Sequence, residues 1–162
     1  MKVVAIIPAR MGSSRFPGKP LAPLSGRPMI EHVYRRTAMS ETLSGVRVAT
    51  CDEEIREAVE AFGGAAIMTS DRHERASDRV AEAMDGLEAD VVVMVQGDEP
   101  MVHPHMIDTA ARALAEDPKI VCVNLFKRIE TEADFENPNT IKVVMDGEGR
   151  ALYFSRRPIP DR

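Results

Sequence analysis

The chain opens with the apolar stretch Val3-Val4-Ala5-Ile6-Ile7 and runs directly into the loop Pro8-Ala9-Arg10-Met11-Gly12-Ser13-Ser14-Arg15-Phe16-Pro17-Gly18-Lys19-Pro20. The first stretch has the length and composition of a short buried strand. In open α/β sheets, ligands bind beyond the carboxyl ends of the strands. The loop that follows this strand is therefore where we expect a nucleotide triphosphate.

The composition of this loop is suited to an anion. Small residues let backbone N–H groups approach phosphate oxygens, hydroxyls add donors, and long cationic side chains supply charge. The residues concerned are Arg10, Gly12, Ser13, Ser14, Arg15 and Lys19. Neither GxxxxGK[ST] nor GxGxxG is present, so the common P-loop and dinucleotide sites are not predicted. The alternative is a solvated basic loop, because exposed Arg and Lys are the norm.

Length and charge indicate a globular protein that does not bind nucleic acid. The 162 residues allow one domain with a sizeable core, and a formal net charge of −5 argues against binding driven by phosphate neutralisation. None of the four His stands at a zinc-like spacing from Cys. Cys51 and Cys122 lie far apart in apolar, strand-like surroundings, so we interpret them as buried small hydrophobes in a reduced protein.

The N-terminal sequence predicts a cytoplasmic protein without a membrane partner. It has one Lys and a five-residue apolar run before Pro and charged residues, which is unlike a secretory signal peptide. No stretch approaches the length that a membrane-spanning helix needs.

Strand-like and helix-like segments alternate along the chain. The predicted strands are 3–8, 46–50, 65–68, 91–95 and 120–126, and the predicted helices are 28–39, 53–62, 77–84 and 104–115. This order predicts an α/β, Rossmann-like fold with a mostly parallel sheet flanked by helices. The unbroken apolar run 91–95 is typical of a parallel strand buried on both faces. Near the C-terminus, segments 141–145 and 151–155 flank Asp146-Gly147-Glu148-Gly149 and predict a β-hairpin.

A second polar cluster, Gln96-Gly97-Asp98-Glu99-Pro100, follows the strand 91–95. Parallel strands end at the same edge of a sheet, so this cluster is expected beside the first loop. Asp98 can hold Mg²⁺ against a triphosphate, because Mg²⁺ combines a carboxylate with phosphate oxygens and waters. Gln96 offers a donor and an acceptor for a base edge or a hydroxyl. The structural alternative is that Asp98 caps the turn and Glu99 is solvated.

Two further segments carry candidate residues whose presence is explained equally well by a structural role and by ligand binding. Asp78, followed by Arg79, lies in the first turn of a predicted helix, where the helix dipole favours a carboxylate without any ligand. His73, just before it, is interpreted as a surface residue. Arg156, within Ser155-Arg156-Arg157 at the end of the hairpin, can face an anion or solvent.

Taken together, these segments resemble the CMP-Kdo synthetase family, the 3-deoxy-manno-octulosonate cytidylyltransferases. The residues that carry the resemblance are 6–10 with 12–15 and 17–20, 58–64, 95–100, 137–139 with 141–144, and 151–156. The resemblance covers essentially the whole chain and implies a single nucleotidyltransferase domain over residues 1–162.

The activity that the resemblance implies is transfer of CMP from CTP to an acidic sugar, Kdo, with release of pyrophosphate, for lipopolysaccharide biosynthesis. Arg10, Lys19 and Asp98 would then be catalytic, with Asp98 holding Mg²⁺. The implied nucleotide contacts are Pro8, Ala9, Arg10, Gly12, Ser13, Ser14, Arg15, Lys19, Asp78, Arg79 and Gln96, and the implied sugar contacts are Gln96 and Arg156. The resemblance also implies a cytoplasmic homodimer.

The chain departs from the family pattern in two ways. Family members typically carry Ser-Gly-Thr before the acidic-Arg pair, where this chain has Arg75-Ala76-Ser77. Another acid sugar, such as a nonulosonic acid, or a different nucleotide therefore stays open. Members also continue past the point where this chain ends, so we expect it to lack a C-terminal part with a further metal-binding Asp, much of the sugar pocket and the dimer contacts. A non-catalytic nucleotide-binding fragment is the remaining alternative.

Overall fold

The computed structural model describes residues 1–12 and 16–159. The chain divides into two compact units, Met1–Leu125 and Phe126–Arg162. The assignment of the whole chain to a single nucleotidyltransferase domain stays a prediction.

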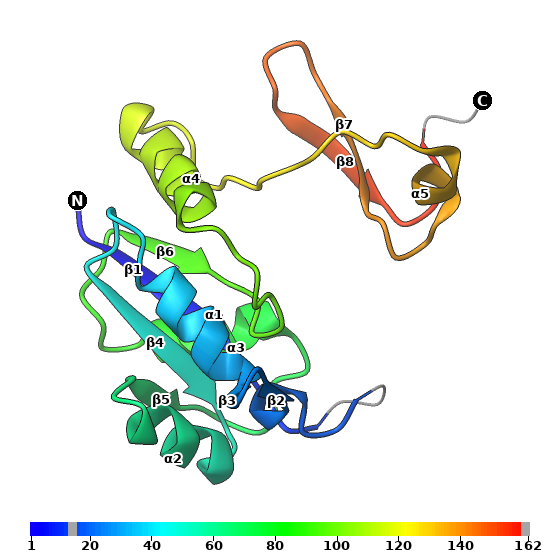
Figure 1. Ribbon diagram of the computed structural model, residues 1–162. Coiled ribbons are helices and arrows are strands. Elements are labelled where there is room, and N and C mark those ends of the chain that lie inside the picture. The colour runs from blue at the N-terminus through cyan, green and yellow to red at the C-terminus, as the bar shows by residue number, and fades with distance from the viewer. Residues whose placement is uncertain (13–15, 160–162) are drawn as a thin grey trace. The chain divides into compact units, whose positions relative to one another are not determined.

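The first unit is an α/β structure built on a parallel sheet (Figure 1). Its strands are β1 (Val3–Pro8), β4 (Gly45–Thr50), β5 (Ala66–Met68) and β6 (Val91–Met94), and its α-helices are α1 (Met29–Thr37), α2 (Glu53–Ala61), α3 (Ala76–Met84) and α4 (Pro104–Glu116). A short 3-10 helix, η1 (Lys19–Leu21), and a small antiparallel pair, β2 (Pro23–Leu24) with β3 (Arg27–Pro28), precede α1. The four-stranded sheet has the order β5-β4-β1-β6, and all its pairings are parallel. The predicted fold class is confirmed.

Strand β1 forms the centre of the core. All six of its residues are buried, and alternate side chains enter two different apolar clusters. Ala5 and Ile7 pack with residues of α1, α2 and α4 on one face of the sheet, whereas Val4 and Ile6 pack with α3 on the other. Figure 1 shows α1 in front of the sheet and α3 behind it. The prediction of helices on both faces is therefore confirmed.

Strand β6 lies at the edge of the sheet, so the prediction of a strand buried on both faces is wrong. Val92 and Met94 are 39% and 43% exposed, whereas Val93 packs against the core on the opposite face. The exposed residues share the face of Val4 and Ile6, where α3 packs over β1 and β4. An apolar run has the same composition at an edge as in the middle of a sheet, so the sequence could not separate these positions.

The fifth predicted strand, 120–126, is also wrong, because this segment joins no ladder in the described part of the chain. Val121 and Phe126 are 93% and 65% exposed. β-propensity reports how well a side chain fits a pleated, half-buried surface, and it supplies no partner for the backbone. Composition alone therefore overpredicted a strand here.

The cysteines differ from the expected pair of buried hydrophobes. Both are free, and Cys122 is exposed because it belongs to the unpaired segment 120–126. Cys51 is half-buried and contacts polar groups, as described below. In the part of the chain that the structure describes, no helix has the length and apolar character needed to cross a membrane.

The second unit contains the predicted hairpin. Strands β7 (Lys142–Met145) and β8 (Ala151–Ser155) pair antiparallel after a short helix, α5 (Glu132–Glu136). The Asp146 carboxylate accepts hydrogen bonds from the backbone N–H groups of Glu148 and Arg150, both at 2.9 Å. Gly149 has a φ of 82°, which a residue with a side chain rarely adopts. The turn residues thus specify the hairpin through local hydrogen bonds and one left-handed glycine.

A buried carboxylate fixes α4 to the loop before β4. Asp108 is 5% exposed, and its Oδ1 accepts hydrogen bonds from the Ser40 hydroxyl at 2.5 Å and from the Thr42 hydroxyl and backbone N–H at 2.9 and 3.1 Å. Burial favours the neutral acid, but these hydrogen bonds and the charge of Arg112 outweigh it and lower the pKa of Asp108. The charged carboxylate therefore stabilises the folded chain.

We predict that Asp108→Ala destabilises the chain by about 1–3 kcal/mol at neutral pH, because Ser40 and Thr42 lose their acceptor. A lowered folded-state pKa contributes stability that is present above the unfolded value, about 3.9, and is lost as pH falls through the folded value. Urea unfolding of the original chain and of Asp108→Ala at several pH values should therefore show that their difference in free energy of unfolding becomes smaller below about pH 4. Asp117→Ala, at the residue that follows α4, is the control, because among the described residues its carboxylate accepts a single hydrogen bond, from the N–H of Lys119. A difference that does not change with pH would contradict this account.

Candidate active site

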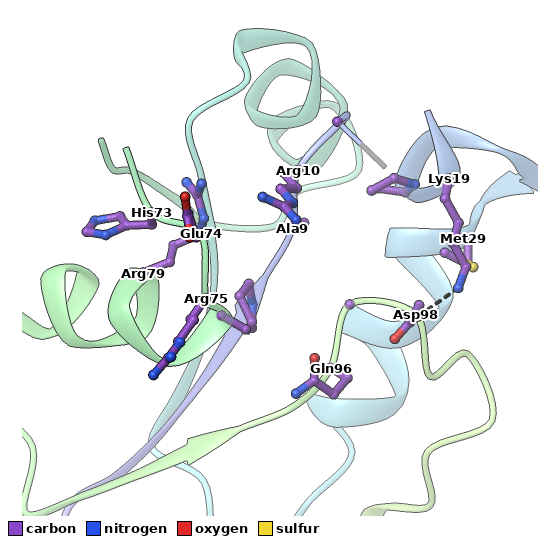
Figure 2. A pocket seen from close by; sticks show the side chains of 15 residues that line it. Ala9, Arg10, Lys19, Met29, His73, Glu74, Arg75, Arg79, Gln96 and Asp98 are labelled. Carbon is purple, nitrogen blue, oxygen red and sulfur yellow. Dashed lines mark hydrogen bonds and ion pairs between the residues drawn. The ribbon is translucent and has the colours of Figure 1, made fainter. Parts of the chain in front are cut away.

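A cavity of about 340 Å³ lies where β1 and β6 end (Figure 2). Four stretches of sequence meet there: the loop after β1, the start of η1 and α1, the loop before α3 with its first turns, and the loop after β6. The lining residues are Pro8, Ala9, Arg10, Gly12, Lys19, Pro20, Met29, His73, Glu74, Arg75, Ala76, Arg79, Gln96, Gly97 and Asp98. The parallel sheet thus brings the two polar loops identified in the sequence to one cavity.

Most of the predicted site residues belong to this lining. They are Pro8, Ala9, Arg10, Gly12, Lys19, Arg79, Gln96 and Asp98. Asp78 is not part of the lining, and Arg156 belongs to the second unit. Ser13, Ser14 and Arg15 lie outside the described residues. The geometry therefore brings together the core of the predicted site, while the roles of its members as ligand contacts stay predictions.

The loops after β1 and β6 approach each other closely because residue 97 has no side chain. The backbone N–H of Val95 donates to the carbonyl of Ile6 at 3.0 Å, which extends the pairing of the two strands. A Cβ atom at Gly97 would lie 2.6 Å from the carbonyl oxygen of Pro8. Only glycine fits at this approach without a backbone shift, and the shift would move Gln96 and Asp98 relative to β1.

Lys19 and Asp98 form an ion pair across the mouth of the cavity. The Lys19 Nζ donates to the Asp98 carboxylate at 2.7 Å, although the residues are 79 positions apart in the sequence. Figure 2 shows the two side chains pointing toward each other. Their side chains are 35% and 49% exposed, so both groups remain accessible to a ligand.

Arg10, like Arg75, is a cation of the lining whose guanidinium is available for a ligand. Its side chain is exposed, and it makes no hydrogen bond or ion pair with a residue that the structure describes. A guanidinium that is not already paired with a carboxylate of the protein can donate two parallel hydrogen bonds to the oxygens of a phosphate or carboxylate ligand. Together with Lys19, these two arginine side chains form the cationic wall of the cavity.

Arg79 is held in place by the protein itself. It is 3% exposed, and its Nη1 donates to the Thr69 hydroxyl at 2.5 Å while its Nη2 donates to the Cys51 sulfur at 3.3 Å. Asp78, one residue earlier, lies in the first turn of α3 and is exposed. This position fits the structural interpretation of Asp78, in which the carboxylate interacts with the helix dipole.

The loop before α3 contributes lining residues that the sequence reasoning missed. His73 was interpreted as a surface residue, yet it lines the cavity and pairs with Glu82. Glu82 also accepts the backbone N–H of Ser70 at 2.9 Å, and the hydrogen bond from His73, followed by that from Ser70, lowers the pKa of Glu82. The signal was available, because this loop follows β5 and must therefore reach the same edge of the sheet as the other two loops.

In the second unit, a buried lysine supports the predicted sugar-binding residue. Lys142 is 2% exposed, and its Nζ donates to the carbonyls of Asn137 at 2.6 Å and Arg156 at 3.0 Å. The guanidinium of Arg156 in turn donates to the carbonyl of Pro138 at 3.1 Å. The burial of Lys142 was not predicted, because a Lys at the start of a hairpin strand is expected to face solvent. The sugar contact of Arg156 stays a prediction.

The donor set around the cavity is compatible with a hard cation bound jointly with a ligand. No group of three or more His, Cys, Asp or Glu side chains able to hold a metal occurs among the described residues. Asp98 presents a half-exposed carboxylate at the cavity, and Mg²⁺ commonly takes few protein carboxylates together with substrate phosphates and waters. The residues fit Mg²⁺ only as a partner of a phosphate ligand.

Comparisons with known proteins give a consistent result. A family model described as cytidylyltransferase matches residues 4–162. The 3-deoxy-manno-octulosonate cytidylyltransferase of Geotalea uraniireducens (strain Rf4) is 55% identical over 161 residues, covering 99% of this chain and 64% of its own length. That of Geobacter metallireducens (strain ATCC 53774 / DSM 7210 / GS-15) is 53% identical, covering 99% of this chain and 63% of its own length. The chain thus spans slightly less than two thirds of the length of these curated relatives.

Solved structures show the same likeness. The structure described as CMP:2-keto-3-deoxy-manno-octonic acid synthetase complexed with CTP has a TM-score of 0.89 and 43% identity, and the match covers 99% of this chain and 66% of that one. A cytidylyltransferase from Leptospira borgpetersenii serovar Hardjo-bovis (strain JB197) has a TM-score of 0.63 and 26% identity, covering 72% of this chain and 50% of that one.

We predict that Gly97→Ala destabilises the first unit by about 1–3 kcal/mol, as expected when an added methyl forces a backbone shift. Thermal unfolding followed by circular dichroism measures the effect, and faster exchange of the Val95 amide would locate it at the junction of β1 and β6. Gly147→Ala is the matched control, since no described atom lies within 4 Å of a Cβ at that position. Equal stability of the two variants would show that the close approach at Gly97 is not a constraint.

Proposed function

Because the chain belongs to the cytidylyltransferase family, we propose that it transfers CMP from CTP to 3-deoxy-manno-octulosonate and releases pyrophosphate. The observation that carries this proposal is the cavity where Arg10, Lys19, Gln96 and Asp98 meet. The solved structure of similar fold that is described as complexed with CTP supports the choice of nucleotide.

The proposed reaction follows from the charges on the cavity wall. The anomeric hydroxyl of the sugar attacks the α-phosphorus of CTP, so that a new O–P bond forms and the hydroxyl proton passes to solvent. The bond from the α-phosphorus to the pyrophosphate oxygen breaks. Arg10 and Lys19 bind the triphosphate and stabilise the negative charge that develops on the leaving pyrophosphate. Cations fixed before the reaction begins lower its barrier without reorganisation.

The ion pair between Lys19 and Asp98 gives the two residues complementary roles. Lys19 binds phosphate oxygens, and Asp98 would hold Mg²⁺ together with those oxygens. When bound, Mg²⁺ would supply charge neutralisation and make the attacking hydroxyl more acidic. Gln96, on the same loop as Asp98, has a donor and an acceptor for the base or a sugar hydroxyl.

The wider setting of the reaction is also part of the proposal. The product would be a sugar donor for lipopolysaccharide biosynthesis in the cytoplasm, and the enzyme would act as a homodimer without a nucleic-acid or membrane partner. The acidic sugar is proposed from the names of the relatives, which are 3-deoxy-manno-octulosonate cytidylyltransferases. Arg75 lines the cavity at a departure from the family pattern, and this observation favours a test of other acid sugars.

Pyrophosphate release from CTP with a panel of sugars tests the function. Kdo, a nonulosonic acid and a neutral hexose are the informative members. Pyrophosphate release with Kdo supports the proposal. Release with the nonulosonic acid alone would show that this acid, and not Kdo, is the acceptor sugar. Binding of CTP without release with any sugar would favour a nucleotide-binding fragment. A chain that does not bind CTP would contradict the proposal itself.

We predict that Arg10→Ala and Lys19→Ala each weaken CTP binding by about tenfold or more, since a charge-assisted hydrogen bond contributes roughly 1.5–3 kcal/mol. Isothermal titration calorimetry with CTP is the measurement. Lys2→Ala is the control, because Lys2 is also partly exposed and paired with a carboxylate, Glu88, away from the cavity. Unchanged affinity in both variants would exclude the cationic wall as the triphosphate site.

We predict that Asp98→Asn abolishes most turnover while leaving the fold intact. Asn preserves the shape of the side chain but removes the charge that holds Mg²⁺ and neutralises Lys19. Mg²⁺-dependent pyrophosphate release and thermal unfolding should be measured on the same preparation. Glu99→Gln removes the neighbouring charge and serves as the control. Near-normal release at low Mg²⁺ would show that Asp98 is not a metal ligand.

A further inference from the structure

The carboxylate of Asp52 does not cap the helix that it precedes. Asp52 occupies the position before α2 where an Asp side chain usually caps the first turn. In the structure, its side chain makes no capping hydrogen bond to α2. Its Oδ2 instead accepts the backbone N–H of Met11 at 2.8 Å, from a residue 41 positions away in the sequence.

Met11 lies at the point where the chain leaves the sheet. The last pairing of β1 with its neighbour is the hydrogen bond from the Ala9 N–H to the carbonyl of Ala49 at 2.9 Å. Two residues later, the N–H of Met11 donates to the Asp52 carboxylate. The carbonyl of Met11 accepts the N–H of Gly18 at 3.0 Å. The N–H and the carbonyl of Met11 are therefore both hydrogen-bonded. These bonds fix the path of the backbone through Arg10 and Gly12, which line the cavity.

Asp52 is itself held by contacts with the two residues that precede it. Its backbone N–H donates to the hydroxyl of Thr50, which is fully buried at the end of β4. The thiol of Cys51 contacts the Asp52 Oδ2 at 3.7 Å, and the same sulfur accepts a hydrogen bond from Arg79 Nη2 at 3.3 Å. A continuous set of contacts thus connects Met11, which lies between the lining residues Arg10 and Gly12, to Arg79, which also lines the cavity.

We propose that Asp52 is a positioning residue, which fixes the backbone of Met11 and thereby sets where Arg10 and Gly12 meet the triphosphate. The proposal rests on the proposed function for the identity of the ligand. Its structural part, the hold of Asp52 on Met11, is independent of that function. The contacts of Cys51 connect this carboxylate to Arg79, another lining residue.

Two variants separate the acceptor from the charge. Asp52→Ala removes both, whereas Asp52→Asn keeps an oxygen that can accept the Met11 N–H. Hydrogen exchange of the Met11 amide, followed by NMR, should be about tenfold or more faster in Asp52→Ala and close to the original rate in Asp52→Asn. Glu53→Ala is the matched control, because it removes one carboxylate from the first turn of α2 that pairs with Arg56. If Glu53→Ala reproduces the change, the proposal is overturned.

Ligand binding completes the test. Calorimetry with CTP and with inorganic triphosphate should show affinities about tenfold weaker in Asp52→Ala and within about twofold in Asp52→Asn and Glu53→Ala, because displaced binding groups lose affinity steeply. Unchanged triphosphate affinity in Asp52→Ala, with its fold intact by circular dichroism, would overturn the positioning role. A chain that binds triphosphate but not CTP would contradict the proposed function instead, while the effect of Asp52→Ala on triphosphate would still decide the role of Asp52.

Discussion

The structure of the first unit depends on the pairing of β1 with a parallel strand on each side. Because the three strands run in the same direction, the loops that leave them must emerge at one edge of the sheet. The register then places the end of β1 beside the end of β6, and Gly97 permits the closest approach. The polar residues of the cavity are far apart in the sequence and meet only because of this backbone constraint.

The cavity combines fixed groups with accessible ones. Arg79 is held by hydrogen bonds to the protein, whereas Arg10 is exposed and Lys19 is paired with a half-exposed carboxylate. Such a division is expected for a site that binds an anion. The fixed groups set the shape and supply no free charge, and the accessible groups exchange their partners for the ligand.

The sequence predicted the parts of this structure that depend on local pattern. The strand–loop boundary at Pro8, the hairpin turn at Asp146 and the convergence of two polar loops follow from periodicity, turn residues and the rules of parallel sheets. Errors arose where tertiary context decides: β6 lies at an edge, 120–126 finds no partner, and Cys122 is exposed. The burial of Lys142 was missed for the same reason, since it is not visible in one segment. The place of His73 in the lining could have been predicted, because its loop follows a parallel strand and so reaches the same edge of the sheet.

The pairing of Lys19 with Asp98 means that the protein carries its own counterion at the cavity. An isolated cationic site attracts small anions from solution, and its affinity for a ligand then falls as those ions compete. Here the competitor is a tethered carboxylate, whose local concentration does not depend on the buffer. Selectivity follows from this arrangement, because a monovalent anion offers Lys19 little that Asp98 does not already supply. A ligand that brings several phosphate charges and its own cation satisfies both residues at once.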